Sequence, residues 1–424
     1  MNQSNLKQML AQANTALDEQ NYALAQTHYR RLLAETSAQT TDPVTHSARL
    51  QAWEKLGDLL YKLGNQEEAL SSFYAYQQEA FTAAQKNNAL ALIGNQLRHM
   101  GRLDEALSTL QEALRLAQAN SDEVGVAAAY LGIGGVHYQA GRLEESLVYL
   151  EKALPGFVKI GDREQQMRTR NWQGIAYMRL GQTDKAISAF TSALKQARLV
   201  NIRATSIVLG NLGQAHQELF DMEQARQYHQ EAMHLAEGTH LIGDIADLSR
   251  NLGVELVYLG RLEEGLTYLY QALSISEETG QLDVKLQSLY SLALAELQQD
   301  NVEMAQSHAQ VLREIAEERN AHAYVADALH ALGLCYKQRS DTNMAMQLWQ
   351  QASFLAHETG QRMLLWQIHG ALADVTPEDG LAQVHRRIAA EVIEQIAYPI
   401  ADDKLRQQFL NAPPVKRVLT QLEN

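Results

Sequence analysis

Cysteine, proline and aromatic residues are scarce in this chain of 424 residues. It contains one cysteine, Cys335, together with 6 prolines and 7% aromatic residues. A single cysteine excludes a disulfide framework within the chain and suits a reducing compartment, so we expect a cytoplasmic protein. The amino terminus lacks the basic start and apolar core of a signal peptide. No stretch approaches the ~18 consecutive apolar residues of a membrane-crossing helix, so we expect no membrane span.

Basic residues are also in deficit, with 36 Lys and Arg against 50 Asp and Glu and a formal net charge of -14. Binding to DNA or RNA phosphates needs positive counter-charge, so we expect no nucleic-acid partner. Strand signals are missing as well, because neither alternating β-branched runs nor Asn-Gly turns occur. The chain is 46% hydrophobic, but one round domain of this length would be unusual. These absences favour an elongated, all-α architecture.

A repeat of nearly 40 residues fills most of the chain. The stretch from Asn251 to Gly280 shows one unit: a helix, a turn at Gly260, and a second helix. A lone hairpin of this kind cannot bury both of its apolar faces, so neighbouring copies must stack. A small residue in the middle of each first helix recurs at steps of 37 to 40 residues, and another small residue follows it by twelve. The first series is Gly57, Gly94, Gly134, Gly174, Gly213, Gly253, Ala293, Gly333 and Gly370.

The turns carry residues that tolerate left-handed backbone geometry, mostly Gly and Asn. The turns between hairpins carry Gly161, Asn201, Gly280, Asn320 and Gly360. The turns within hairpins carry Gly64, Gly101, Gly141, Gly181 and Gly260, with Phe220, Asp300 and Ser340 replacing Gly elsewhere. Pro155 falls inside an expected second helix, and we expect it to bend that helix or end it early.

The repeat resembles the tetratricopeptide repeat family. The family's W-x₂-L-G-x₂-Y…A-x₃-F…A arrangement is matched by Trp53, Leu56, Gly57, Leu60, Ala69 and Phe73, by Gly174, Tyr177, Ala186, Phe190 and Ala193, and by Gly333, Tyr336, Ala345, Trp349 and Ala352. The usual period is ~34 residues. The longer period here resembles the branch of Pins-type and kinesin-light-chain-type proteins and of bacterial regulators.

This resemblance implies an all-α fold, a right-handed α-solenoid of about ten helical hairpins with a C-terminal capping helix segment. Four segments are expected along the chain. Residues 1–40 are expected to form a degenerate N-terminal helical pair, and residues 41–360 are expected to form eight repeats. Residues 361–397 are expected to form an atypical last repeat, and residues 398–424 are expected to form C-terminal capping helices. In the last part we expect a long helix to about Ile396, a short one around Leu405 to Leu410, and a final one after Pro413.

No catalytic motif accompanies the repeats. Gly132, Gly134 and Gly135 lie in a glycine-rich stretch without the preceding strand or the following Lys-Ser/Thr of a phosphate loop, so we interpret them as helix contacts. His229 falls on the aromatic position of the repeat and is predicted to be a packed core residue. Cys335 is predicted to be a buried structural thiol. We expect no catalytic residues, no metal ligands and no cofactor, and hence no enzyme.

Each first helix leaves a second stripe of residues free, at six and three positions before the central small residue and one and four after it. In the tetratricopeptide family this stripe lines the concave surface where extended or helical peptide segments lie. Cations recur along it with amides and tyrosines between them, and Arg can hold carboxylates bidentately. The predicted partner-binding groove consists of Tyr61, Asn88, Asn95, Arg98, Tyr138, Arg168, Asn171, Gln214, Arg250, Tyr290, His330 and Lys337.

The main hypothesis is a protein-protein interaction scaffold whose groove binds a partner peptide with acidic groups among apolar ones. The alternative is a sensory or regulatory module of a bacterial signalling system, in which a small ligand or signal peptide changes the solenoid and so the activity of a partner. An enzyme is a third option. A solvated helix face that binds nothing also fits the stripe. An uncovered end of the solenoid could stack on another chain, so self-association stays open.

Overall fold

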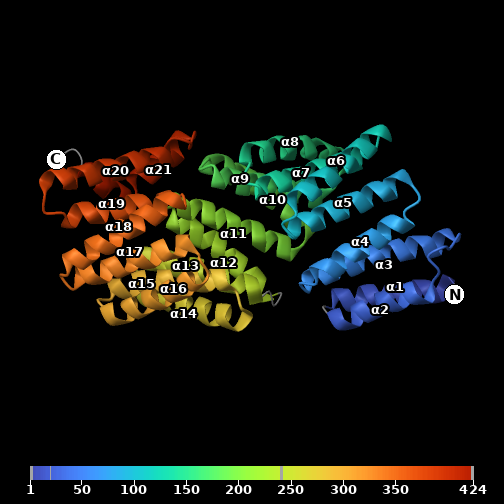
Figure 1. Ribbon diagram of the computed structural model, residues 1–424, viewed down its shortest axis with the longest axis horizontal. Coiled ribbons are helices and arrows are strands. Elements are labelled where there is room, and N and C mark those ends of the chain that lie inside the picture. The colour runs from blue at the N-terminus through green and yellow to red at the C-terminus, as the bar shows by residue number, and fades with distance from the viewer. Residues whose placement is uncertain (1–2, 20, 239–241, 422–424) are drawn as a thin grey trace. The chain divides into compact units, whose positions relative to one another are not determined.

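The computed structural model describes residues 3–19, 21–238 and 242–421, and all regular elements in these ranges are helices (Figure 1). The chain divides into two compact units, Met1–Trp172 (unit 1) and Gln173–Asn424 (unit 2). The division falls inside helix α9 (Arg163–Arg179). Within each unit the helices follow one another as antiparallel pairs, as expected of a tetratricopeptide-type α-solenoid of about ten hairpins with a C-terminal cap.

Unit 1 contains four hairpins and the first part of α9. Its core is a continuous cluster that includes Leu6, Tyr29, Leu59, Phe73 and Leu110, none more than 3% exposed. The hairpin helices are α1 (Gln3–Asp18), α2 (Tyr22–Glu35), α3 (Pro43–Lys62), α4 (Gln66–Glu79), α5 (Ala83–His99), α6 (Leu103–Ala119), α7 (Glu123–Gln139) and α8 (Leu143–Ile160).

Unit 2 begins with the second part of α9 and ends with the C-terminal helices. Its main core cluster includes Trp349, Trp366 and Phe409. The helices are α10 (Thr183–Val200), α11 (Ile202–Glu218), α12 (Met222–Gly238), α13 (Ile242–Tyr258), α14 (Leu262–Thr279), α15 (Leu282–Gln298), α16 (Val302–Glu318), α17 (His322–Gln338), α18 (Thr342–Glu358), α19 (Arg362–Val375), α20 (Asp379–Ala397), α21 (Asp403–Asn411) and α22 (Pro413–Thr420).

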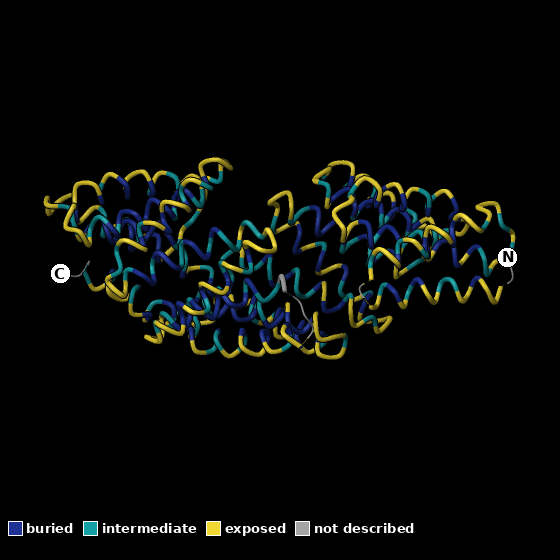
Figure 2. The backbone as a smooth tube through the Cα atoms, turned by 90° about the horizontal axis from the view of Figure 1, so that it is seen from below, coloured by how far each residue is buried: buried dark blue, intermediate teal, exposed yellow. Residues whose placement is uncertain are grey.

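In seven hairpins the glycine in the middle of the first helix leaves space for a side chain of the second helix, whereas Gly370 faces Val418 of α22. A Cβ atom on Gly57 would lie 2.4 Å from Phe73, and one on Gly333 would lie 2.2 Å from Trp349. Both partners come sixteen residues later in the sequence, on the second helix. The same pairing joins Gly174 to Phe190, Gly213 to His229, Gly94 to Leu110, Gly134 to Leu150, and Gly253 to Leu269. The repeat therefore encodes a fixed contact that closes these seven hairpins, and their helices accordingly have a buried side (Figure 2).

The turns adopt left-handed geometry even where glycine is replaced. Phe220, Asp300 and Ser340 have φ angles of 57°, 60° and 65°, a conformation that costs non-glycine residues free energy. Asn201 differs from this pattern. Its backbone is extended, with φ -167°, and its side chain accepts a hydrogen bond from the Ala204 N–H at 2.7 Å, so it caps α11 instead of forming a left-handed turn.

Helix α8 does not end at Pro155 but continues to Ile160. The expectation of an early end is therefore wrong. Phe157, which is 2% exposed, anchors the last turn in the core. A Cβ on Gly156 would lie 2.7 Å from the Ala127 Cβ, so α8 approaches α7 closely at this point. Burial of this turn outweighs the lost backbone hydrogen bond of the proline.

The last helices fold back along unit 2. We call residues 398–421 the C-terminal segment; it contains α21 and α22, close to the positions expected from the prolines. Phe409 is fully buried and stacks on Phe220 with ring centroids 6.1 Å apart. The Asp402 N–H donates to Asp184 Oδ2 at 3.3 Å. The segment therefore packs on α10 and on the turn after α11, far earlier in the sequence, in addition to the neighbouring α20.

Candidate functional site

The free stripe of unit 1 surrounds a cavity of about 480 Å³, which we call the unit 1 cavity. Its walls are formed by α3, α5 and α7, the first helices of three successive hairpins, and by the unit 1 part of α9. Five of the predicted groove residues line it together: Tyr61, Asn88, Asn95, Arg98 and Arg168. The repeat period brings them together because each stripe position points to the same side of the stacked helices.

Arg98 is the most deeply placed cation of this cavity. It is 8% exposed, and its Nε has no hydrogen-bond partner. One terminal nitrogen, Nη2, donates to His99 Nε2 at 3.0 Å, and the guanidinium lies 5.6 Å from the centroid of the Trp172 ring. Gly135 of α7 makes room for it, since a Cβ there would lie 3.2 Å from Arg98 Nε. Burial, followed by the charge of Arg168, lowers the pKa of Arg98.

His99 orients the Tyr61 hydroxyl in this site. Burial and the charges of Arg98 and Arg168 lower the pKa of His99 to about 4, so its ring is neutral near pH 7. A guanidinium only donates, so His99 Nε2 accepts from Arg98 and its proton resides on Nδ1. The Nδ1 lies 3.2 Å from the Tyr61 hydroxyl oxygen, which therefore accepts. The Tyr61 O–H proton remains available to a further acceptor.

Carboxylates occupy another part of the wall. Burial raises the pKa of both Glu54 and Asp58, which lie one helical turn apart on α3. The amide of Asn88 approaches Glu54 Oε2 at 3.5 Å. The charges of Lys55, Lys62 and Arg168, in this order, partly oppose the upward shift of the Asp58 pKa. The stripe positions counted from Gly57 include Glu54 and Asp58, but the predicted groove residues did not include them.

Two predicted residues near this cavity are placed differently. Tyr138 packs edge-on against Trp172, with ring centroids 5.1 Å apart. Neither Tyr138 nor Asn171 belongs to the residues that line the cavity, whereas Trp172 does. On α9 the predicted Arg168 lines the cavity, and Trp172 lines it instead of the adjacent Asn171. The sequence signal that could have indicated this position is the aromatic residue Trp172, directly after Asn171.

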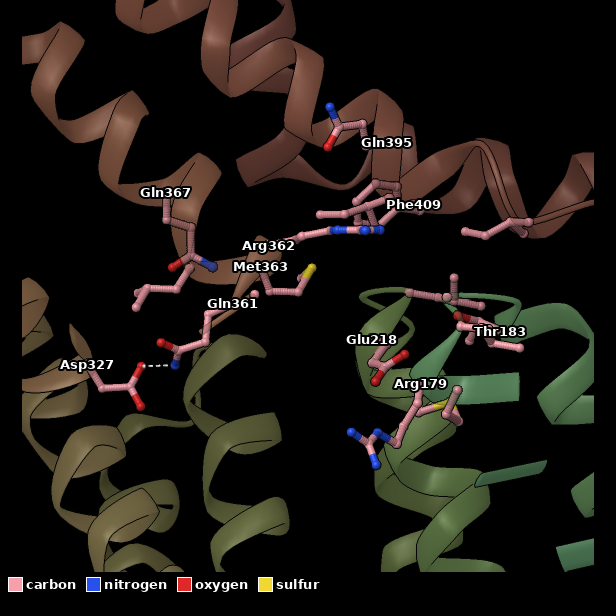
Figure 3. Close-up of a pocket in the computed structure, with 18 of the residues that line it drawn as sticks. Arg179, Thr183, Glu218, Asp327, Gln361, Arg362, Met363, Gln367, Gln395 and Phe409 are labelled. Atoms are coloured by element: carbon pink, nitrogen blue, oxygen red, sulfur yellow. Dashed lines mark hydrogen bonds between the residues drawn. The ribbon is translucent and has the colours of Figure 1, made fainter. Parts of the chain in front are cut away.

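A larger cavity of about 710 Å³ lies in unit 2, and we call it the unit 2 cavity (Figure 3). Glu218 projects into it from one side and Asp327 from the other, with Phe409 of the C-terminal segment on a third wall. Burial raises the pKa of Glu218 to about 8, although a hydrogen bond from Thr183 opposes the shift. Burial also raises the pKa of Asp327 to about 7, and Gln361 donates to its Oδ1 at 3.2 Å.

The C-terminal segment covers the stripe in this part of unit 2. Arg417 of α22 and Lys337 both bind Asp374 Oδ2, at 3.0 and 3.2 Å. His330 is 4% exposed, and its Nδ1 lies 2.9 Å from the Tyr290 hydroxyl. Tyr290 lines the unit 2 cavity, and His330 and Lys337 line another cavity of about 790 Å³ together with Arg417 and Val418 of α22. These three predicted residues therefore lie near the C-terminal segment.

The remaining predicted groove residues, Gln214 and Arg250, do not line the unit 1 cavity or the unit 2 cavity. Arg250 is bound by Asp247 of its own helix at 3.0 Å. Burial raises the pKa of Cys335 to about 11, which makes it a poor nucleophile. Across the described ranges, no group of three or more His, Cys, Asp or Glu is arranged to hold a metal ion.

No helix within the described residues is long and apolar enough to cross a membrane. The glycine-rich stretch predicted as a helix contact lies inside the continuous helix α7 and not in a loop. Gly132 and Gly134 face Leu110 and Leu150, and Gly135 faces Arg98. Two of these glycines therefore serve packing, and the third makes room for a cavity residue.

Family models for the tetratricopeptide repeat match residues 10–88, and 83–157 with 165–238. These segments together span more than half of the chain, and their hairpins carry the contacts described above. The chain belongs to the tetratricopeptide repeat family. The resemblance drawn from the sequence is thereby confirmed.

Several solved structures share this tetratricopeptide fold. The apo form of the quorum sensor NprR from B. thuringiensis is 14% identical, with a TM-score of 0.60 over 83% of this chain and 99% of that one. A Rap protein complexed with Competence and Sporulation Factor is 13% identical, with a TM-score of 0.54 over 85% and 99%. Aspartyl phosphate phosphatase F from Bacillus subtilis is 14% identical, with a TM-score of 0.54 over 84% and 94%.

Proposed function

We propose that this protein is a binding scaffold and that the unit 1 cavity holds a segment of a partner protein or peptide. The observation that carries this proposal is the convergence of one stripe, from four successive repeats, on a cavity with amides, a tyrosine and two guanidinium groups. Polar groups at fixed positions in a concave site fix the orientation of a ligand. The deep placement of Arg98, supported by Gly135, argues against a merely solvated helix face.

A display selection followed by crosslinking tests this function. Random peptides are selected on the full chain, and a photo-crosslinking amino acid is then placed at Val124 or, as control, at Val148. Both valines are about half exposed, at 48% and 47%, but only Val124 lines the cavity. We expect selected peptides to crosslink at Val124 and not at Val148. Equal capture at both positions, or no selected peptides, would contradict the proposal.

We also propose that the protein is not an enzyme and that it resides in the cytoplasm. The neutral His99 accepts from Arg98 and so is not placed as a base next to a nucleophile. Cys335 is buried with a raised pKa, and a single thiol suits a reducing compartment. Because aspartyl phosphate phosphatase F shares the fold, the direct test is hydrolysis of acetyl phosphate and of phosphorylated response regulators by the purified chain. Turnover above background would overturn this proposal.

A second candidate function is a sensory or regulatory module, and one observation favours it. The C-terminal segment lies over stripe residues of unit 2 and encloses part of the unit 2 cavity. A ligand that entered there would compete with, or reinforce, contacts of this segment. The quorum sensor NprR and the Rap protein bound to its factor are built on the same fold. A ligand-induced change in hydrogen exchange of α21 and α22, with no protein partner present, would support this candidate.

A further inference from the structure

Four charged groups of the unit 1 cavity lack an opposite charge in direct contact. Among the described ion pairs closer than 4.0 Å, none involves Arg98, Arg168, Glu54 or Asp58. Removing a charge from water without a partner costs several kcal/mol. Arg168 is exposed, whereas Arg98 is buried and Glu54 and Asp58 are partly buried. Arg98, Glu54 and Asp58 are therefore the desolvated charges, of both signs, that a ligand can neutralise.

The positive part presents only donors. Arg98 Nε carries an unused N–H, and the Tyr61 O–H proton is free because Nδ1 of the neutral His99 donates to its oxygen. Arg168 adds a second guanidinium, which has no acceptor atom. A carboxylate, which only accepts, is complementary to this set.

The negative part presents mainly acceptors. The Glu54 carboxylate has one weak contact, at 3.5 Å from Asn88, and Asp58 lies one turn along the same helix. Burial raises the pKa of both groups, so a cation beside them would recover the free energy lost through their desolvation. An ammonium or guanidinium group of a ligand meets this requirement.

The two parts together exclude simpler ligands. A segment with acidic residues alone would bring further carboxylates beside Glu54 and Asp58, and a basic segment would meet the guanidinium groups. Asp162 also lines the cavity, and its Oδ1 accepts a hydrogen bond from the Gln165 N–H at 3.0 Å. The lining therefore carries three carboxylates and two guanidinium groups, and a ligand with a single charge sign would leave one part without a counter-charge. A phosphate dianion fits less well than a carboxylate because Glu54 and Asp58 line the same cavity as Arg98 and Arg168 and repel the additional negative charge.

We propose that the unit 1 cavity recognises a bipolar peptide segment, with its carboxylate at Arg98 and Arg168 and its cationic group at Glu54 and Asp58. This inference rests on the proposed function and adds the chemistry of the partner. It differs from the sequence-based expectation of an acidic segment, because it requires an Asp or Glu and a Lys or Arg at a fixed spacing. The two requirements are separable by substitution, because they reside on different helices.

The test repeats the peptide selection on the wild-type chain, on Arg98→Gln/Arg168→Gln and on Glu54→Gln/Asp58→Asn. We expect wild type to select peptides with one acidic and one basic residue at constant spacing. The arginine variant should lose only the acidic preference, and the carboxylate variant only the basic one. A selected peptide should bind the arginine variant about tenfold to a hundredfold more weakly. Replacing the acidic residue of the peptide by the corresponding amide should weaken its binding to the wild-type chain by the same factor. The same replacement should leave its affinity for the arginine variant almost unchanged, because the partner of the carboxylate is already missing there.

Matched controls are Arg115→Gln and Glu112→Gln, at exposed positions of α6 outside the cavity, and circular dichroism melting verifies the fold of every variant. Two results would overturn the inference and leave the proposed function intact. One is selected peptides of a single charge sign, and the other is additive losses of affinity when the arginine substitutions and the peptide amide substitution are combined. An absence of selected peptides would remove both. Displacement by inorganic phosphate but not by acetate would identify a phosphate site and also overturn it.

Discussion

His229 and Glu255 form a hydrogen bond in the core of unit 2, where neither side chain is exposed to solvent. The ring Nδ1 lies 2.6 Å from Glu255 Oε1, and Nε2 lies 3.1 Å from the Gly210 carbonyl oxygen. The carbonyl only accepts, so Nε2 donates to it. Burial raises the pKa of Glu255, which favours a protonated carboxyl that donates to Nδ1. Both ring nitrogens of His229, which occupies the aromatic position of the repeat, therefore have hydrogen-bond partners in the core.

Substitution of His229 by Phe should destabilise unit 2 although Phe is the usual residue at this position. The change removes the hydrogen-bond partner of the buried Glu255, at a cost of about 1–3 kcal/mol. His229→Phe/Glu255→Leu should recover part of this loss. The measurement is thermal unfolding followed by circular dichroism, with His234→Phe as control because His234 is exposed on the same helix. A His229→Phe protein as stable as wild type would show that the hydrogen bond contributes nothing.

Much of the fold follows from the sequence because the closing contact of each hairpin recurs in it. The small residue and its partner on the second helix, such as Gly57 with Phe73, carry the same signal in successive repeats. The interpretation of His229 as a core residue has the same basis. The packing of Phe409 on Phe220 could not be predicted, because this contact joins distant parts of the chain and occurs once. The division at Trp172 likewise leaves no compositional trace.

The site was predictable as a stripe, but not in its chemistry. Helical spacing placed Arg98, Arg168 and Asn95 on one wall, and the structure brings them to one cavity. The local pattern does not show which charges lose water, so the burial of Glu54 and Asp58 could not be predicted. In unit 2 the same spacing selected Tyr290, His330 and Lys337, which lie near the C-terminal segment in the folded chain; their role in binding stays a prediction.

Gly135→Ala should weaken peptide binding without removing any charge. The new Cβ would lie 3.2 Å from Arg98 Nε, so the guanidinium must shift away from its position in the cavity. We expect up to tenfold weaker binding of a selected bipolar peptide in a fluorescence anisotropy titration, because a shift of a few tenths of an ångström disturbs the bidentate geometry between Arg98 and the peptide carboxylate.

Gly210→Ala is the matched control for this change. Its Cβ would meet nothing closer than 3.8 Å, so it should gain ~1 kcal/mol of helix stability and leave binding in unit 1 unchanged. Equal affinity of the Gly135→Ala protein and wild type for the peptide would show that the position of Arg98 does not matter for binding.

Stability of unit 2 should fall as pH rises from 5 to 9. Burial raises the pKa of Glu218 from 4.5 to about 8 and that of Asp327 from 3.8 to about 7. A raised pKa contributes stability that is fully present below the unfolded-state value and is lost as pH rises through the folded-state value. Most of the loss should therefore be complete above pH 8. Melting temperatures measured across this range test the direction.

Glu218→Gln/Asp327→Asn should flatten this dependence, because amides stay neutral at every pH in the range. Glu263→Gln, at an exposed position of α14, is the control and should keep the slope of wild type. A wild-type melting temperature that rises between pH 5 and 8 would reverse the sign and rule out neutral carboxyls in the unit 2 cavity.

Phe409→Ala should release the C-terminal segment from unit 2. The phenyl ring is fully buried against Phe220, and truncating a buried Phe costs about 3–5 kcal/mol, which here falls on the attachment of two short helices. Hydrogen exchange measured by mass spectrometry should therefore accelerate in residues 403–420 while α15 and α17 remain protected. Tyr398→Ala is the matched control, since it removes an aromatic ring that is 86% exposed on the same segment. Equal exchange rates of residues 403–420 in the two variants would show that Phe409 does not hold the C-terminal segment on unit 2. A ligand in the unit 2 cavity could then not act on the segment through its contact with Phe409.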